Sequence, residues 1–168
     1  NMNSASSARC YAEEVEMDGH WGNEIHAMDY LVYAYLQIGD NKSANELNEY
    51  FETIYKVNSQ FDPYNFVAIP ARIVLENKQW AKAAKLTIQD SQYHWEDFPW
   101  VKSLIHFTRA LGAAHIGSIK AAEKELAVIN ERKRELEYQI KHLKNLQHSI
   151  AETQSPFNPT TILMNNKT

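Results

Sequence analysis

The sequence predicts an all-α fold, in which antiparallel helical hairpins stack in series and a long helix closes the chain. Three observations predict it. Glycine and proline are scarce among the 168 residues, with five of each, which disfavours a turn-rich β fold. Apolar residues recur at helical spacing over much of the chain. Alanine recurs at one interval, at Ala5, Ala44, Ala83 and Ala122, and a fixed period of this size is typical of stacked helical hairpins.

The positions between paired helices follow the same interval. Gly39, Lys78 and Gly117 lie in "LQIGDNKSANEL", "LENKQWAKAAKL" and "AHIGSIKAAEKEL". Each string contains a helix end, a turn, and a second helix whose early alanine permits close approach. Seven helices are expected, the first being the outer helix of an incomplete repeat and the other six forming three pairs: 3–16, 23–38, 41–57, 63–76, 79–89, 99–116 and 118–150.

Local signals support the boundaries of these helices. Asp62 is placed to cap helix 63–76, and Pro63 stands at its first position, where a missing N–H is harmless. Pro70 lies inside that helix and should bend or divide it. Pro99 opens the next long helix in the same way as Pro63, and Ser118 is placed to cap the last helix. No strand-like alternation of useful length is visible.

The last helix is expected to be much longer than the average helix. Ile129, Leu136, Leu143 and Ile150 recur every seven residues. Such a repeat suggests a coiled-coil seam, although polar residues interrupt the stripe. The stripe suits either self-association or the helix of a following repeat. We divide the chain into a helical domain, 1–150, and an irregular tail, 151–168.

Charge and cysteine content narrow the classes of function. The net charge is −4, and residues 1–99 are acidic whereas residues 100–168 are basic. The basic half is diluted by glutamates, so no nucleic-acid partner is expected. No apolar run is long enough to span a membrane. The single Cys10 gives no support to secretion. The cytoplasm is slightly favoured, but a removed signal peptide stays open because the chain starts with Asn1.

The repeated strings resemble the tetratricopeptide-repeat (TPR) family. Gly39 and Ala44 match the glycine and alanine of that repeat, Trp80 and Ile119 stand at its bulky position, and Tyr35 at its aromatic one. The chain is similar to a group of bacterial TPR proteins without an assigned activity, over about residues 5–135. The resemblance implies a right-handed solenoid of about three hairpins plus one preceding helix, and further repeats upstream.

In such an array the first helix of each repeat lines a concave face, which is the usual partner surface. The expected concave residues of the first full repeat are His26, Asp29 and Tyr33, which share one helical face. Arg72 is their counterpart in the second repeat and offers a planar fork to a carboxylate. His106 and Arg109 lie near the corresponding face of the third repeat. The alternative is that these are ordinary surface side chains, with His26 and Asp29 as a surface pair.

Catalysis, a metal and a cofactor are not expected. The seven histidines show no HExxH spacing, and no CxxC or glycine-rich phosphate loop is present. The aromatic segment "QYHWEDFPW", residues 92–100, is expected to pack between repeats rather than to bind a ligand.

The sequence therefore favours a non-catalytic scaffold that binds a peptide or protein on its concave face. One alternative is a structural module that self-associates into a homo-oligomer through helix 118–150. A less favoured one is an enzyme or metal protein that missing N-terminal repeats complete.

Overall fold

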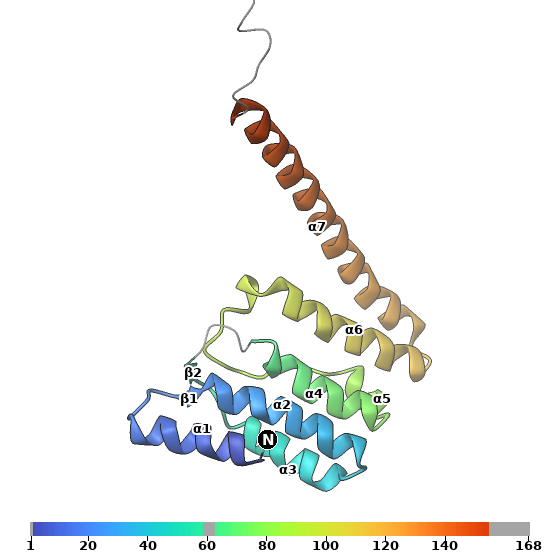
Figure 1. Cartoon of the computed structure of the whole chain (residues 1–168). Helices are drawn as coiled ribbons and strands as arrows, with labels where there is room; N and C mark the ends of the chain where they lie inside the picture. The colour runs from blue at the N-terminus through green and yellow to red at the C-terminus, as the bar shows by residue number, and fades with distance from the viewer. Residues whose placement is uncertain (1, 59–62, 155–168) are drawn as a thin grey trace, which may run out of the picture. The chain divides into compact units, whose positions relative to one another are not determined.

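The computed structural model describes residues 2–58 and 63–154, and this part of the chain is mostly helical, as the sequence predicts (Figure 1). The chain divides into two compact units, residues 1–129 and 130–168. The elements, in chain order, are α1 (Met2–Glu14), β1 (His20–Trp21), α2 (Gly22–Gln37), α3 (Asn41–Phe51), β2 (Val57–Asn58), α4 (Asn65–Glu76), α5 (Trp80–Ala83), the 3-10 turn η1 (Trp95–Asp97), α6 (Pro99–His115) and α7 (Ile119–Gln154).

The helices of the first unit follow one another in space in roughly the order of the chain. Helix α2 contacts α1, α3 and α4, and α4 in turn contacts α5 and α6 (Figure 1). A short turn joins α2 to α3, α4 to α5, and α6 to α7.

The three turns between paired helices have the same backbone geometry. Gly39, Lys78 and Gly117 all have positive φ angles, of 76°, 52° and 75°. The residue after each donates a 2.8 Å hydrogen bond to the carbonyl five positions earlier, a helix-ending arrangement that satisfies free carbonyls. This conformation is easy for glycine but strained for Lys78. The 39-residue interval of the sequence is therefore an interval of identical turns.

The four equally spaced alanines are buried between helices. Ala44 and Ala83 have no exposed surface, and Ala5 and Ala122 keep only 6% each. A side chain longer than a methyl group would force the paired helices apart at these positions.

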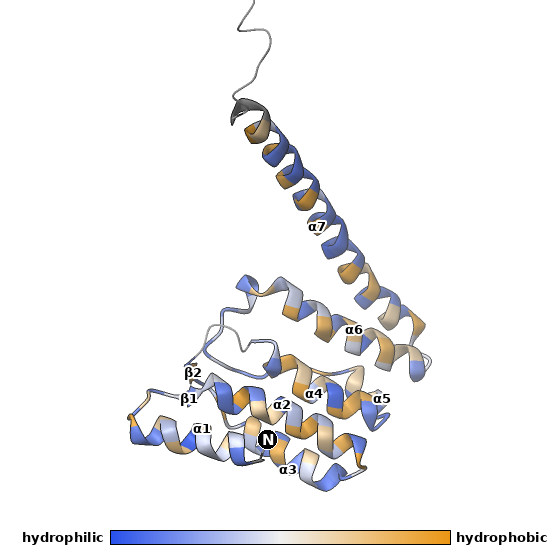
Figure 2. Cartoon of the chain, in the orientation of Figure 1, coloured by the Kyte–Doolittle hydropathy of each residue, from blue (hydrophilic) through white to orange (hydrophobic). Residues whose placement is uncertain are grey.

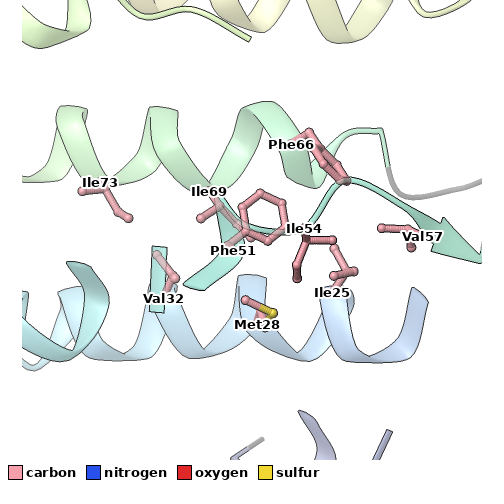
Figure 3. Packing of buried hydrophobic residues seen from close by; sticks show 9 residues of the cluster. All are labelled: Ile25, Met28, Val32, Phe51, Ile54, Val57, Phe66, Ile69 and Ile73. Atoms are coloured by element: carbon pink, nitrogen blue, oxygen red, sulfur yellow. The ribbon is translucent and has the colours of Figure 1, made fainter. Parts of the chain in front are cut away.

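The main core lies between α2 and α4. Ile25, Met28 and Val32 extend from α2, and Ile69 and Ile73 extend toward them from α4 (Figure 3). The core is completed by Phe51, Ile54, Val57 and Phe66. Burial of these side chains on one face of α2 leaves its opposite face available to solvent.

Two of the predicted helices are too long. The segment expected as helix 41–57 is helical only to Phe51, and the one expected as 79–89 only from Trp80 to Ala83. The side-chain amide of Gln89 donates hydrogen bonds to the backbone carbonyls of Phe51 and Ile54, at 3.1 and 2.9 Å. The chain after α5 thus adds a side-chain donor to carbonyls at and just after the end of α3, which a longer α5 would not permit.

Two short strands occur in the described part of the chain, where the sequence shows no strand-like alternation of useful length. β1 and β2 pair in parallel, with His20 opposite Val57 and Trp21 opposite Asn58. Each strand has only two residues, too few to produce a recognisable alternation. The pairing holds the entrance of α2 beside the chain that leaves α3.

Smaller differences concern helix ends. α4 begins at Asn65, so Pro63 lies before the helix rather than at its first position, and the expected cap Asp62 lies outside the described residues. α4 continues through Pro70 without a break, so the proline does not divide it. Pro99 opens α6 as expected.

α7 extends beyond the predicted 118–150, and its residues 130–154 are the described part of the second unit. It therefore enters the segment expected as an irregular tail, of which residues 155–168 lie outside the described part. The boundary between compact units falls at residues 129 and 130, inside the predicted domain 1–150.

Aromatic residues of segment 92–100 pack as the sequence predicts. Tyr93 and Trp95 contact Phe66 of the main core, with ring centroids 5.5 and 6.3 Å apart. Trp95 and Phe98 also pack on a second cluster that includes Val101. Trp100 differs, because it is exposed.

At Gly112 the backbone of α6 lies close to that of α5, with no room for a Cβ atom. A Cβ atom added there would lie 2.4 Å from the backbone nitrogen of Ala84 and 2.7 Å from the carbonyl oxygen of Trp80. We expect Gly112→Ala to lower the free energy of unfolding by about 1–3 kcal/mol, measured by denaturant titration with tryptophan fluorescence.

The matched control is Ala114→Ser, an exposed position on the same helix, which should change stability by less than about 0.5 kcal/mol. Alanine is the better helix former, so equal or higher stability of Gly112→Ala would show that α5 and α6 do not meet there.

Candidate functional site

The exposed side of α2 carries a row of aromatic and polar side chains. His26, Tyr30, Tyr33 and Gln37 are all exposed, at spacings of four, three and four residues, so they share one helical face. About half of each tyrosine is accessible, 51% for Tyr30 and 49% for Tyr33. We call the surface formed by these four residues the α2 face.

A groove borders the α2 face on the side of α1. Its volume is about 500 Å³ and it is open to solvent. Two ring pairs lie along it, Tyr11 with Trp21 at 4.8 Å and His26 with Tyr30 at 4.9 Å. Hydroxyl and amide groups from both helices complete the lining, which is formed by Ser4, Ser7, Ala8, Tyr11, Trp21, Asn23, His26, Ala27 and Tyr30.

An ion pair borders the α2 face on the side of α4. Nη1 of Arg72 lies 2.8 Å from Oδ1 of Asp29 and donates a hydrogen bond to the Asp29 carbonyl at 3.2 Å. That carboxylate oxygen is buried and accepts no well-aligned hydrogen bond, so it depends on the charge of Arg72. The guanidinium also lies 5.5 Å from the centre of the Tyr33 ring, within cation–π range.

The structure thus brings together three of the four residues predicted for the first two repeats. Arg72 is not an ordinary solvated surface side chain, because it forms an ion pair with Asp29. Its fork is therefore partly used within the chain rather than left for a ligand carboxylate. His26 does not pair with Asp29; its ring and that of Tyr30 form a T-shaped pair in the α1 groove.

His106 and Arg109 form a separate group with Glu125, near the start of α7. Nδ1 of His106 lies 2.6 Å from one Glu125 oxygen, and Nη1 of Arg109 lies 3.9 Å from the other. Arg109 also donates a 2.6 Å hydrogen bond from Nε to the carbonyl of Leu86. Polar atoms of both residues are thus held by partners in the chain, and the structure does not join them to Asp29 and Arg72.

One fully buried ionisable group of the described residues is not among the site residues that the sequence predicts. Glu24 of α2 has no exposed surface. Its Oε1 accepts hydrogen bonds from Nε of Arg9 at 2.9 Å and from the Tyr50 hydroxyl at 3.0 Å. Its Oε2 lies 2.9 Å from Nδ1 of His20. A single carboxylate therefore joins α1, β1, α2 and α3.

Electrostatics around Glu24 favour a structural role for this cluster. The Arg9 guanidinium also lies 4.4 Å from the centre of the Tyr50 ring. Burial, together with the neighbouring Glu24 carboxylate, raises the pKa of Tyr50 to about 12. Three donors fix the carboxylate, so it is not available as a free base or as an open metal ligand. A pocket of about 450 Å³ lies beside it, lined by Arg9, Ala12, Glu13, Glu16, Met17, Gly19, His20, Glu24 and Tyr50.

One signal in the sequence pointed to Glu24. It precedes Ile25 and lies four residues from Met28, both core residues, so it falls on the buried side of α2. A carboxylate there requires partners. The sequence did not identify them, because Arg9 and Tyr50 are 15 and 26 residues away.

Two further findings apply to the described part of the chain. Among residues 2–58 and 63–154, no three histidine, cysteine, aspartate or glutamate side chains lie close enough to hold a metal ion. Within the same ranges no helix has both the length and the apolar composition that crossing a membrane requires.

The Glu24 cluster generates a prediction about stability. Glu24→Gln keeps the shape of the side chain but removes its charge, so it no longer satisfies Arg9, His20 and Tyr50 together. We expect the free energy of unfolding to fall by about 1–3 kcal/mol in denaturant titration. The control Glu13→Gln, at an exposed position of the same pocket, should change it by less than about 0.5 kcal/mol. Equal losses in the two variants would contradict the role of Glu24.

Tyr50 should make the free energy of unfolding depend on pH above about pH 10. Unfolded Tyr50 loses its proton near pH 10, whereas in the folded protein its pKa is about 12. The folded state therefore holds this proton more tightly, and the resulting stability is lost as the pH rises from about 10 to about 12. Tyr50→Phe should flatten this decline when unfolding is measured across the window. Tyr55→Phe, which changes an exposed ring, should keep the wild-type slope. Identical slopes in all three proteins would rule out the assignment.

Comparisons of the chain with protein-family models, with curated proteins and with solved structures find no match.

Proposed function

We propose that the chain is a non-catalytic helical-repeat scaffold that binds an extended peptide or protein segment along the α2 face. The observation that carries the proposal is the row of exposed rings, His26, Tyr30 and Tyr33, between the α1 groove and the Asp29–Arg72 pair. Tyrosine is enriched at binding interfaces because its ring offers apolar area and its hydroxyl offers a polar contact.

The α2 face is held in place by contacts within the chain, without a partner. The opposite side of α2 is anchored in the main core through Ile25, Met28 and Val32. Arg72 further restrains Tyr33 from the neighbouring helix. Binding to such a surface needs little ordering of the scaffold, which reduces the entropic cost of association.

The repeated turns support the architecture that this function needs. Three turns at one interval share their φ sign and their hydrogen bonds, and each is followed by a buried alanine. This regularity is what a TPR-like right-handed solenoid requires, and the proposed face belongs to the first helix of a pair. In solenoids the surface built from such helices is the usual site for an extended partner.

The chemistry of the groove suggests the type of segment that it accepts. Rings from Tyr11, Trp21 and Tyr30 suit an apolar or aromatic side chain of the partner. The hydroxyls of Ser4 and Ser7 and the amide of Asn23 suit the polar backbone of an extended peptide. The partner is thus a peptide with at least one large apolar side chain, held mainly by ring contacts.

The proposal is tested by selecting peptides from a random displayed library on the immobilised full chain. Binding of each selected peptide is then measured by calorimetry with Tyr30→Ala, Tyr33→Ala and a control, Tyr55→Ala. Tyr55 is equally exposed, at 56%, but lies after α3. We expect each α2 variant to weaken binding by at least about tenfold, the loss typical of an aromatic contact at the centre of an interface, and the control to bind like the wild type.

Two outcomes would contradict the proposal. One is that no peptide is enriched over repeated rounds of selection. The other is that enriched peptides bind the two α2 variants as tightly as they bind the parent chain, which would place the binding surface elsewhere.

A further inference from the structure

The second unit carries an apolar stripe that the proposed peptide binding does not use. Along α7, orange apolar segments recur among blue polar ones (Figure 2). The large side chains of the stripe are half exposed or more, namely Leu136 at 51%, Ile140 at 51%, Leu143 at 63% and Ile150 at 54%. Large apolar residues at regular spacing on a solvated helix are typical of an interaction surface.

The spacing of this stripe is that of a coiled coil. Steps of four and three residues alternate along the row Leu136, Ile140, Leu143, Gln147 and Ile150. In heptad notation Lys133, Ile140 and Gln147 occupy a, and Leu136, Leu143 and Ile150 occupy d. All three d positions are thus apolar, whereas the a positions carry one lysine and one glutamine.

We propose that residues 133–150 of α7 pair with the same segment of a second copy of this chain, as an antiparallel coiled coil. At its centre Ile140 of each copy packs against Leu143 of the other. This goes beyond the proposed peptide binding and uses none of the residues of the α2 face.

The polar a positions favour the antiparallel direction. In a parallel pair aligned in register, Lys133 would face Lys133 across the seam, and Gln147 would face Gln147. Like charges facing each other in a seam are unfavourable. In an antiparallel pair each a residue packs against a d residue, so Lys133 lies beside Ile150 and Gln147 beside Leu136. The long stem of a lysine can cover such an apolar neighbour while its charge reaches water.

The flanking charges then select one register. Glu137 and Lys144 both occupy e, beside the seam. In the proposed register Glu137 of each copy lies next to Lys144 of the other, so the contact forms twice. A shift by one heptad in either direction brings Glu137 against Glu137 or Lys144 against Lys144. Within its own chain Glu137 forms an exposed pair with Lys133, 3.8 Å away, which does not compete strongly.

Charge complementarity thus points to a second copy as the occupant of this stripe. The segment supplies both members of each charge pair and both sides of each apolar layer. A different partner would have to carry the same pattern in reverse.

The first test measures the mass of the full chain by sedimentation equilibrium over a wide range of concentration. We expect a reversible dimer, and we expect Ile140→Asp and Leu143→Asp to raise its dissociation constant by at least about tenfold. The control is Tyr138→Asp, which introduces the same charge at an f position, 74% exposed and away from the seam. This control should dimerise like the wild type.

The charged pair is tested by reversal. Glu137→Lys alone should weaken the dimer, and Glu137→Lys with Lys144→Glu should restore it. Direction is tested by mixing Glu137→Cys and Lys144→Cys chains, both with the exposed Cys10 replaced by serine. Oxidation should link the two chains to each other in preference to linking either one to itself.

Each outcome decides the proposal. A monomer at all concentrations overturns it, and so does a dimer that the Ile140 and Leu143 variants leave unchanged. Preferential linking of identical chains would overturn the antiparallel arrangement. The substituted side chains are exposed and lie outside the first unit, which holds all the tryptophans, so unfolding of the first unit followed by tryptophan fluorescence should remain as in the parent chain and separates lost pairing from lost folding. None of these results depends on the peptide-binding measurement, so the two proposals fail independently.

Discussion

Paired helices in this chain meet where a residue with positive φ ends one helix and a buried alanine opens the next. The backbone reverses direction there without large apolar side chains, and the small methyl group of the alanine lets the two paired helices approach closely. Because the same turn returns at 39-residue steps, the paired helices leave their turns with the same local geometry. Lys78 shows how strong the constraint is, since it takes a conformation that glycine adopts more easily.

The surroundings of α2 follow from this arrangement. Helix α2 lies against α1, α3 and α4, so one side of it supplies the main core and the other stays in solvent. Glu24 sits on the buried side, where only a set of donors from α1, β1 and α3 makes a carboxylate tolerable. The rings of the α2 face are thus displayed by a helix that is fixed on its other side by apolar packing and by a buried polar cluster.

The candidate site was partly predictable for a physical reason. Helical spacing alone places His26, Asp29 and Tyr33 on one side of a helix, and a repeat of 39 aligns Arg72 with them. Spacing does not say which charges meet, so the pairing of Arg72 with Asp29, and of His106 and Arg109 with Glu125, had to come from the structure. The Glu24 cluster could not be predicted from the sequence for the same reason, since its members are dispersed along the chain.

The sequence by itself determined the all-α class, the repeated turns and the heptad stripe of α7, because these depend on residues a few positions apart. Tertiary structure decided where α3 and α5 end, that His20–Trp21 pairs with Val57–Asn58, and which polar groups are buried. Those features depend on groups that find partners far along the chain, such as Arg9 with Glu24 at a separation of 15 residues and Gln89 with Phe51 at a separation of 38. Secondary-structure propensity depends on neighbouring residues and not on such distant partners, so the partners are set only in the folded chain.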